Sequence, residues 1–308
     1  MTSGSVPLQS YDLAKYAVQL PCLICGGGNN VDAELCRYCQ APLALAHQAR
    51  DKKTPPQLIA TIGTADAGKT VYLGMLMDIL SRHTTDLQLL ARGAFSVSLQ
   101  QQTIAALSRC RFPEKTPNDP DRWNWVHCQV RQQGRKQPVE LIMPDLAGEA
   151  ILEELDHPQT YPVITAFLAR CRGVLLLIDT ARLDAGEEDQ DFFAMKIMSF
   201  LAEVDRPVPA GKKGRRPAPP PLPEVAVVFT KADRCAVCFE DPDLFARRRT
   251  PGLWQMCREQ FPEHRFFGVS VAGACAELWE GGARRTIPLR IEPRGVVEPF
   301  RWLVQKLS

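Results

Sequence analysis

The sequence has no strong excess of charge of either sign and no apolar run long enough to cross a bilayer. Its 308 residues carry a formal net charge of +2, which is too small by itself to indicate binding to nucleic acid or to a membrane. One of the longest apolar runs, Gly173–Ile178, is far shorter than the about 20 residues that a membrane-spanning helix needs. The first residues, MTSGSVPLQSYDLAKY, are polar and lack the pattern of a signal peptide. We therefore expect a cytoplasmic protein with no membrane span, and no nucleic-acid partner is indicated.

Disulfide bonds are also not expected, although the sequence contains 11 cysteines. A disulfide framework is typical of small secreted chains, whereas this chain is long and shows no sign of secretion. Hydrophobic residues make up 45% of the sequence, which is enough for a sizeable core and is typical of a globular protein. The length allows one large domain and one small one.

Two closely spaced cysteine pairs, each C-x-x-C, lie near the N-terminus and are separated by ten residues. Each pair can form a tight knuckle that directs two thiolates at one metal ion, so that two knuckles complete a tetrahedral site. We predict structural Zn²⁺ here, with a redox pair or an iron–sulfur cluster as the alternatives. The predicted ligands are Cys22, Cys25, Cys36 and Cys39. The segment resembles the bacterial zinc ribbons in its C-x-x-C-G-x-x-N pattern and in Pro42-Leu43, although Gln40 replaces their usual Gly.

A glycine-bounded loop follows a short apolar run and precedes a helical pattern expected over residues 71–81. It reads GTADAGKT over residues 63–70 and matches G-x-x-x-x-G-K-[ST]. Backbone N–H groups of such a loop converge on phosphate oxygens, and the dipole of the following helix adds to the field. Gly63 and Gly68 permit backbone angles or close approaches that a Cβ would block. Lys69 is expected to reach the β- and γ-phosphates and Thr70 to coordinate Mg²⁺, whereas an ordinary glycine turn before a helix would do neither.

Two strand-like runs, residues 123–131 and 138–145, are separated by a polar turn that contains Gly134. This pattern predicts an antiparallel hairpin, which is the arrangement of the GTPase class of phosphate-loop folds. The second run ends in DLAGE. Asp145 at the end of a strand can hold Mg²⁺ through water, and the N–H of Gly148 can reach the γ-phosphate. A continuous apolar run over residues 173–179 then predicts a buried parallel strand, and residues 189–204 predict a helix.

The pattern after the next predicted strand, residues 225–229, selects the base. It reads Thr230-Lys231-Ala232-Asp233 and matches [NT]-K-x-D. The Asp233 carboxylate can accept hydrogen bonds from the guanine N1–H and exocyclic amine, and adenine lacks this donor pair. A further apolar run, residues 265–269, is followed by Ser270-Val271-Ala272, which fits a loop that closes over guanine. The chain finishes with an expected packing helix whose apolar residues include Val297, Phe300 and Leu303.

These patterns predict an α/β fold of the phosphate-loop NTPase class. We expect a Ras-like G domain whose mostly parallel sheet has one antiparallel edge strand, preceded by a small zinc ribbon. The expected boundaries are residues 1–48 for the N-terminal segment with the ribbon and residues 49–308 for the GTPase domain. Residues 206–223 are proline-rich and basic and have no apolar period, so we expect an exposed insertion there.

With these motifs in place, the chain resembles the TRAFAC-type GTPases, and its GTADAGKTVYL, FPEKT, DLAGE and FTKAD strings resemble the bacterial double-GTPase group. The resemblance implies GTP and GDP as ligands, a protein partner such as a second GTPase, an activator or an effector, and a setting in bacterial conflict or defence. It also implies that Thr116 is the switch threonine, with Thr103 as its rival. Asp66 stands where some relatives coordinate a monovalent cation. Glu149 departs from the Gln of Ras-like enzymes, and its charge beside the γ-phosphate predicts slow intrinsic hydrolysis.

The predicted function is a GTP-binding switch that hydrolyses GTP to GDP with Mg²⁺. One alternative is a guanine-nucleotide-binding adaptor with weak catalysis whose zinc ribbon recruits a partner, and another is a phosphate-loop ATPase. The residues predicted to bind the nucleotide are Gly63, Asp66, Ala67, Gly68, Lys69, Thr70, Val71, Asp145, Thr230, Lys231, Asp233, Ser270 and Val271. Those predicted to act in hydrolysis are Lys69, Thr116, Gly148 and Glu149, and the predicted Mg²⁺ ligands are Thr70, Thr116 and Asp145.

Overall fold

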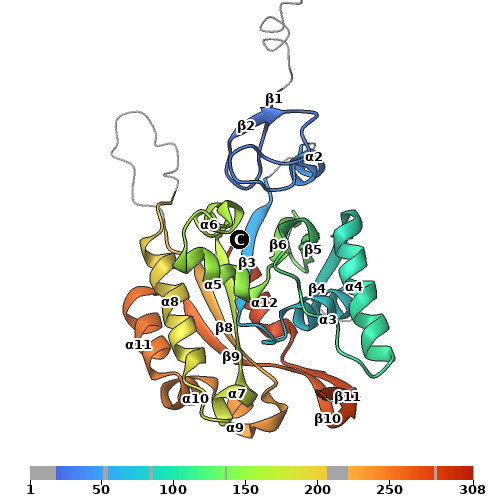
Figure 1. Cartoon of the computed structure of the whole chain (residues 1–308), viewed down its shortest axis with the longest axis vertical. Helices are drawn as coiled ribbons and strands as arrows, with labels where there is room; N and C mark the ends of the chain where they lie inside the picture. Colours follow the sequence, from blue (N-terminus) through green and yellow to red (C-terminus); the bar gives the residue numbers. More distant parts are fainter. Residues whose placement is uncertain are drawn as a thin grey trace, which may run out of the picture.

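A seven-stranded sheet runs through the main body of the chain (Figure 1). The computed structural model describes residues 19–50, 55–82, 86–135, 137–206, 221–280 and 283–307. Strand β5 pairs antiparallel with both of its neighbours, and all pairs from β6 to β9 are parallel. In spatial order the strands are β4 (Leu87–Arg92), β5 (Asn124–Gln132), β6 (Val139–Asp145), β3 (Gln57–Gly63), β7 (Gly173–Asp179), β8 (Glu224–Thr230) and β9 (His264–Gly268).

The predicted hairpin of the GTPase class is present as β5 and β6. The antiparallel strand lies one position in from the edge of the sheet, because Leu87–Arg92 adds a further strand outside it. The sequence of this segment, LQLLAR, does not by itself distinguish a strand from a turn. Its alternating buried and exposed leucines, with Leu87 and Leu89 buried and Leu90 exposed, are typical of an edge strand with one face on the core.

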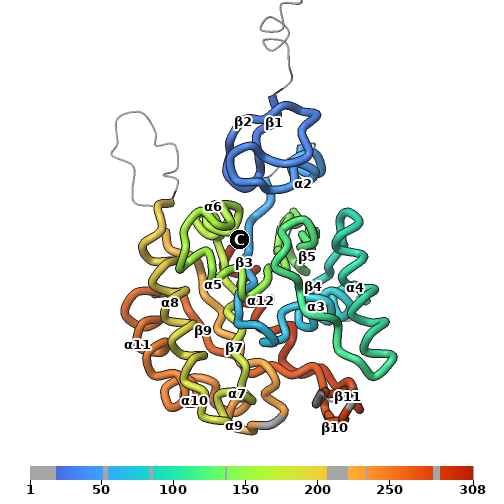
Figure 2. The backbone as a smooth tube through the Cα atoms, viewed as in Figure 1, coloured from blue at the N-terminus to red at the C-terminus, as the bar shows by residue number. Residues whose placement is uncertain are grey.

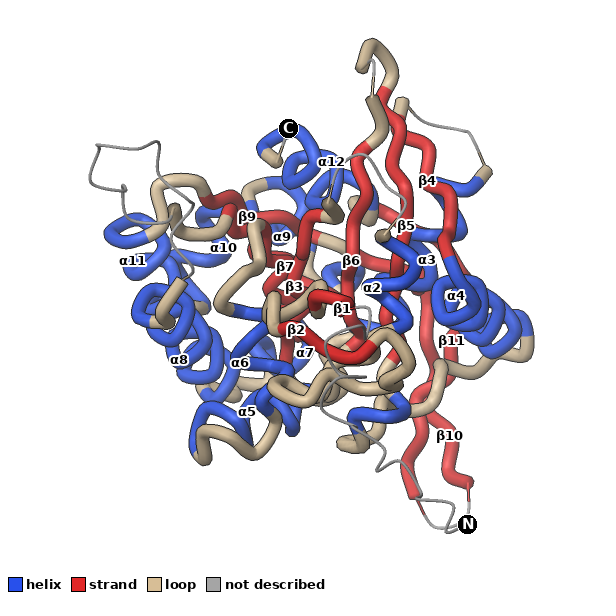
Figure 3. Tube along the Cα trace, turned by 90° about the horizontal axis from the view of Figure 1, so that it is seen from above, coloured by secondary structure: helices blue, strands red, loops and turns tan. Residues whose placement is uncertain are grey.

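Helices cover both faces of the sheet, so that the main body has three layers, with the sheet in the middle (Figure 3). Successive residues of a strand point to opposite faces, so the continuous apolar runs supply two cores: Leu58 and Val227 belong to one buried cluster, and Ile59 and Val228 belong to the other. On the first face lie α5 (Gly148–Asp156), α6 (Pro162–Leu168), α8 (Asp189–Glu203), α10 (Pro242–Arg249) and α11 (Pro251–Gln260). On the second lie α3 (Lys69–Ser81), α4 (Gly93–Ser108) and α12 (Val297–Lys306).

Short elements gather where the parallel strands end. They are α7 (Thr180–Asp184) after β7, and η2 (Ala232–Arg234) and α9 (Ala236–Glu240) after β8. Another short turn, η1 (Pro120–Arg122), precedes β5. Since the carboxyl ends of β3, β6, β7 and β8 share one edge of the sheet, the loops that carry the predicted motifs are brought to the same place.

The N-terminal module packs beyond the start of β3, at the end of the sheet opposite the carboxyl ends of the parallel strands (Figure 2). It consists of β1 (Gln19–Pro21), β2 (Gly28–Asn30), α2 (Ala44–Ala49) and the two C-x-x-C turns. Its buried Leu43 and Leu45 belong to the same hydrophobic cluster as Phe167 of α6. Polar contacts add to this packing: Arg170 donates to the Ile24 carbonyl at 3.3 Å, and the Gln48 Oε1 lies 3.1 Å from the His127 Nδ1.

A long two-stranded ribbon, β10 (Ser270–Glu280) with β11 (Ala283–Arg294), replaces the simple loop expected at residues 270–272. Figures 1 and 2 show it extending from the carboxyl edge of the sheet. Its exposed apolar side chains include Leu278, Trp279 and Leu289. The sequence contained a hairpin signal, since two runs with β-forming residues flank Gly281-Gly282.

Two further expectations concern segments that the structure covers only in part. Most of the predicted insertion at residues 206–223 lies outside the described residues, which include only Arg206 and residues 221–223 of it. In the part of the chain that the structure describes, no helix is both long and apolar enough to cross a membrane.

Candidate functional site

The loop between β3 and α3 has the shape that a phosphate group requires. Gly68 adopts φ +85°, in the left-handed region that favours glycine, and an added Cβ there would meet open space. Gly63 is constrained differently, because a Cβ there would lie 2.6 Å from the carbonyl oxygen of Leu177 on the neighbouring strand. The two glycines therefore serve different purposes: one turns the loop into the helix, and the other lets β3 pack closely against β7.

Lys69 is buried inside this loop and bends back toward its backbone. Its Nζ donates to the carbonyl oxygens of Gly63 and Thr64, both at 3.0 Å. Burial lowers the pKa of Lys69 to about 8, against the opposing effect of the Asp145 and Asp66 carboxylates. The loop thus holds a cation whose charged form is poorly compensated, and a phosphate anion would supply the missing countercharge.

Three oxygen-bearing side chains meet beside this loop, although they are far apart in the sequence. The Thr70 hydroxyl donates to Asp145 Oδ2 at 2.8 Å, and the Thr116 hydroxyl donates to the same oxygen at 3.1 Å. The two hydroxyls lie 3.0 Å apart. Asp145 Oδ1 is buried and has no hydrogen-bond partner among the described residues, and burial raises the pKa of this carboxyl. A hard cation bound by oxygen ligands fits this donor set, so these residues could hold Mg²⁺.

The segment after β6 lies directly against the phosphate loop. A Cβ on Gly148 would come within 2.5 Å of the Gly63 carbonyl oxygen and 2.7 Å of the Ala65 nitrogen, so only glycine permits this approach. The next residue, Glu149, is exposed, and its carboxylate pairs with the Lys115 ammonium and accepts from the Asn118 amide at 3.3 Å. The hydrogen bond from Lys115 lowers the pKa of Glu149 and raises that of Lys115.

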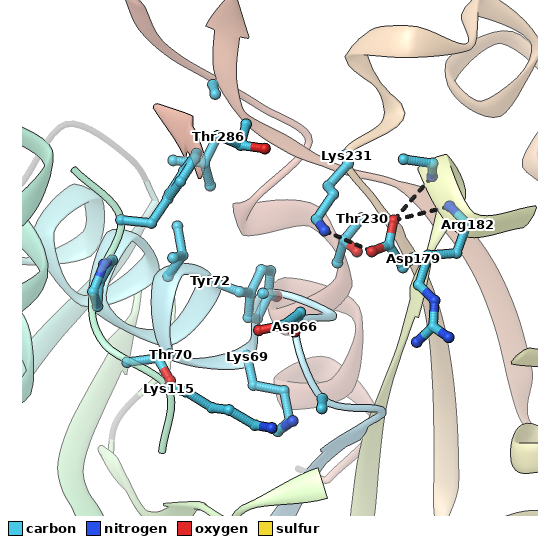
Figure 4. A pocket seen from close by; sticks show the side chains of 18 of the residues that line it. Asp66, Lys69, Thr70, Tyr72, Lys115, Asp179, Arg182, Thr230, Lys231 and Thr286 are labelled. Carbon is cyan, nitrogen blue, oxygen red and sulfur yellow. Dashed lines mark hydrogen bonds and ion pairs between the residues drawn. The ribbon is translucent and has the colours of Figure 1, made fainter. Parts of the chain in front are cut away.

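The TKAD segment forms the other end of the site. The Thr230 hydroxyl donates to the Ile178 carbonyl at 3.1 Å, and Lys231 adopts φ +55° as the chain leaves β8. The Lys231 Nζ lies 2.6 Å from Asp179 Oδ2, an ion pair that Figure 4 shows between the two strand ends. Asp233 is exposed, and its Oδ1 accepts a hydrogen bond from the Ser270 hydroxyl at 2.7 Å.

One cavity of about 640 Å³ joins the phosphate loop to the TKAD segment. This volume lies in the usual range for a small-molecule site. Of the predicted residues, those that line the cavity are Asp66, Gly68, Lys69, Thr70, Val71, Thr116, Gly148, Thr230, Lys231, Asp233, Ser270 and Val271. Gly63, Ala67 and Asp145 lie behind this lining and are buried. Glu149, which follows Gly148 in the chain, is exposed and does not line the cavity.

Two further features of the sequence do not line this cavity. Thr103 is buried in α4, where its side chain packs against Gly74 of α3 and not beside the phosphate loop. Cys235 and Cys238 form a third C-x-x-C directly after TKAD, but the structure brings no third or fourth metal ligand to them among the described residues.

Sequence reasoning missed several residues of the site. In the sequence Asp179 stands only at the end of an apolar run, although an acidic residue at the carboxyl end of a parallel strand is a usable signal. Nothing in the sequence marks Lys115 as a site residue apart from its place beside Thr116. Arg182 of α7 lines the cavity and is held by Glu187 at 2.5 Å and Asp189 at 2.7 Å. The ribbon residues that line the cavity, among them Thr286, had no sequence signal that linked them to the site.

The four N-terminal cysteines form a separate candidate metal centre. Their sulfur atoms all lie within 4.8 Å of one another, with Cys22 and Cys39 3.7 Å apart and Cys25 and Cys36 3.5 Å apart. A tetrahedral Zn²⁺ with Zn–S bonds of about 2.3 Å requires sulfur separations close to these. Backbone N–H groups of Gly27 and Tyr38 also point at sulfurs, each at 3.4 Å, as expected for outer-shell support of thiolate ligands. The cluster fits a structural zinc ribbon.

Comparison with known proteins identifies one matching family. Residues 57–274, which span the phosphate loop, DLAGE and TKAD, match the Double-GTPase 2 family. No curated protein sequence matches the chain.

Solved structures similar to this chain include a protein bound to GDP and a small GTPase. The Roco2 RocCORdC of Methanosarcina barkeri bound to GDP is 14% identical over 83% of this chain, with a TM-score of 0.36, and the match spans 50% of that protein. The Arl6 (BBS3) small GTPase of Trypanosoma brucei, with the bound nucleotide analogue GppNp, is 13% identical over 82% of this chain and 96% of that one, with a TM-score of 0.38.

Proposed function

Since this chain belongs to the Double-GTPase 2 family, we propose that it binds guanine nucleotides with Mg²⁺ and hydrolyses GTP to GDP. The observation that carries the proposal is the convergence of Thr70, Thr116 and Asp145 at one end of a cavity whose other end presents Asp233. In this proposal, one small-molecule cavity joins a phosphate-and-metal site to a guanine-recognition site.

Each residue has a defined task in the proposed reaction. Lys69 and the loop N–H groups neutralise the β- and γ-phosphates, and Gly148 offers its N–H to the γ-phosphate. Thr70, Thr116 and Asp145 would hold Mg²⁺, which would neutralise negative charge on the phosphates. Water attacks the γ-phosphorus and the bond to the β,γ-bridging oxygen breaks. Loss of the γ-phosphate ends its contacts with the segments that carry Thr116 and Gly148, so that a partner meets a different surface.

The base end of the site supports guanine over adenine. The Ser270 hydroxyl donates to Asp233 Oδ1 and would orient this exposed carboxylate to accept from N1–H and the exocyclic amine of guanine. Val271 and Ala272 at the start of the ribbon line the same cavity. A phosphate-loop ATPase would have no use for this acceptor.

Slow turnover and a protein partner are part of the proposal. Glu149 stands where a neutral side chain would orient the attacking water, and a second negative charge beside the γ-phosphate is unfavourable. For this reason a guanine-nucleotide-binding adaptor that does not hydrolyse GTP remains the second candidate. A second GTPase, an activator or an effector would be the partner, in the conflict or defence setting that the family resemblance implies.

Two measurements on the full chain test the proposal. We expect guanine nucleotides, and not ATP, to displace a fluorescent guanine nucleotide, and we expect Mg²⁺-dependent release of phosphate from GTP. Asp233→Asn should abolish the preference for guanine over adenine, whereas Asp241→Asn, which alters a helix-capping aspartate at α10, should leave it unchanged. Equal competition by ATP and GTP would overturn the proposal. Tight GTP binding without turnover, alone or with partners, would favour the adaptor.

A further inference from the structure

A second lysine lies at the phosphate end of the cavity. Lys115 lines the same cavity as Lys69, and Figure 4 shows its side chain extending from the segment before β5 toward Lys69. The two ammonium groups influence each other electrostatically, since the charge of Lys115 contributes to the lowered pKa of Lys69. Two like charges at one end of a cavity favour a polyanionic ligand there.

The position of Lys115 is fixed by its neighbour in the chain. Thr116 is held by hydrogen bonds to Asp145 and Thr70 beside the phosphate loop, so the backbone of residue 115 lies close to the place where the γ-phosphate would be. The Lys115 side chain, in contrast, is about half exposed and, among the described residues, is held only by its pair with Glu149. An anchored backbone with a long flexible cation can place charge where it is needed.

The present partner of Lys115 is easily exchanged. Lys115 and Glu149 are exposed to 49% and 48%, and an ion pair this accessible to water contributes little stability. A γ-phosphate carries more negative charge than a carboxylate and offers more acceptor oxygens, so it would compete well for the lysine. Asn118 also donates to the Glu149 carboxylate at 3.3 Å, which gives that carboxylate a second donor when the lysine leaves.

We propose that Lys115 is a γ-phosphate-contacting cation, supplied by the chain itself, and that Glu149 is the positioning residue that holds it when no γ-phosphate is bound. This inference rests on the proposed function and extends it. GTP would draw Lys115 from Glu149 to the γ-phosphate, whereas GDP would leave the ion pair intact. Lys115 would then both discriminate GTP from GDP and neutralise the charge that spreads over the γ-phosphate oxygens as the bond to the leaving oxygen breaks. When Lys115 moves to the γ-phosphate, the Asn118 amide still donates to the Glu149 carboxylate.

The test compares Lys115→Gln with a variant at a second surface ion pair, which joins α8 to the other end of α5. Lys196 pairs with Asp156 at the end of this helix, with similar exposure of both side chains, so Lys196→Gln removes an equivalent surface ion pair away from the cavity. We expect Lys115→Gln to lower the ratio of affinities for a non-hydrolysable GTP analogue and GDP by about tenfold or more. It should also lower the single-turnover rate by at least as much, while GDP affinity stays within about twofold of wild type. Lys115→Arg should retain most of both, and Lys196→Gln should match wild type.

Glu149→Gln separates the positioning role from a structural one. If Glu149 holds Lys115 in the GDP state, its removal should weaken discrimination against GTP and raise the affinity ratio, in the direction opposite to Lys115→Gln. Unchanged GDP affinity reports that each variant is folded. A wild-type affinity ratio and rate in Lys115→Gln would overturn this inference and leave the proposed function standing, whereas failure of the wild-type chain to bind guanine nucleotides would overturn both.

Discussion

The Lys231 ammonium and the Asp179 carboxylate, at the ends of the neighbouring strands β8 and β7, lie 2.6 Å apart. Asp179 has two tasks, because its other oxygen, Oδ1, accepts from the Ala181 and Arg182 N–H groups at the start of α7. The pair thus ties the TKAD segment to the helix beside it. It sets the direction of a lysine whose stem would lie along the base of the nucleotide.

Asp179→Asn keeps an oxygen that can accept from the helix N–H groups but removes the charge that holds Lys231. We expect the affinities for GTP and GDP to fall together, by about tenfold, because the base and not the γ-phosphate loses a contact. Titration calorimetry with both nucleotides would measure this. Asp184→Asn, at the end of α7, breaks the ion pair with Arg249 of α10 and is the control. A loss of affinity confined to GTP would contradict the role of Asp179 in holding Lys231 against the base.

Nucleotide affinity should depend on pH through Lys69. Its pKa is about 8 without ligand, and a bound phosphate would raise it because the anion favours the charged form. The charged form binds, so affinity is full below pH 8 and decreases as pH rises through this value, by up to about tenfold per pH unit. The charged groups that act on Lys69 are Asp145, Asp66, Lys115 and Glu149.

This pH dependence is measured as the dissociation constant of GDP across the alkaline range. The guanine N1–H also titrates there, so Lys69→Arg provides the correction, because arginine stays protonated. That variant is expected to bind more weakly but to lose only the part of the pH dependence that belongs to the lysine. Identical pH profiles for the two proteins would assign the effect to the base alone.

Thr116→Ala should affect the triphosphate state selectively. Its hydroxyl meets Thr70 and Asp145, so its loss removes one of the oxygens expected to hold Mg²⁺ when GTP is bound. We expect the Mg²⁺-dependent rate of GTP hydrolysis to fall by about tenfold or more, with GDP affinity nearly unchanged. Thr160→Ala, at an exposed threonine beyond α5, should have no effect. An unchanged rate would remove Thr116 from the site.

Removal of metal from the N-terminal module should change stability and not base preference. The module shares a buried cluster with α6, and a small metal-dependent fold loses its structure with the ion. We expect Cys36→Ser to abolish zinc binding and to lower the thermal midpoint, while guanine remains preferred over adenine, because Asp233 lies at the opposite edge of the sheet. Cys110→Ser, at an exposed cysteine, should retain zinc by elemental analysis. Equal zinc contents in the two variants would contradict a four-cysteine metal site.

Features that are local or periodic were predictable from the amino-acid sequence alone. The α/β fold, the hairpin before DLAGE and the positions of most strands follow from apolar runs bounded by polar loops, because burial on both faces of a parallel strand leaves a continuous signal. The four-cysteine cluster follows from spacing alone, since each C-x-x-C places two sulfurs in one turn. GTADAGKT and TKAD are similarly short, and each carries its chemistry within a few consecutive residues.

The contacts between these segments became evident only from the folded chain. Sequence spacing did not distinguish Thr116 from Thr103, whereas the fold brings Thr116 to Asp145 and buries Thr103 against Gly74. The pair of Lys115 with Glu149 joins residues on different segments, and no periodic pattern encodes such a contact. Asp179 and Lys231 meet for the same reason, because they end strands that pair side by side in a parallel sheet. Motifs show which chemistry a chain can perform, but the distance between two motifs is set by how the strands that carry them pair.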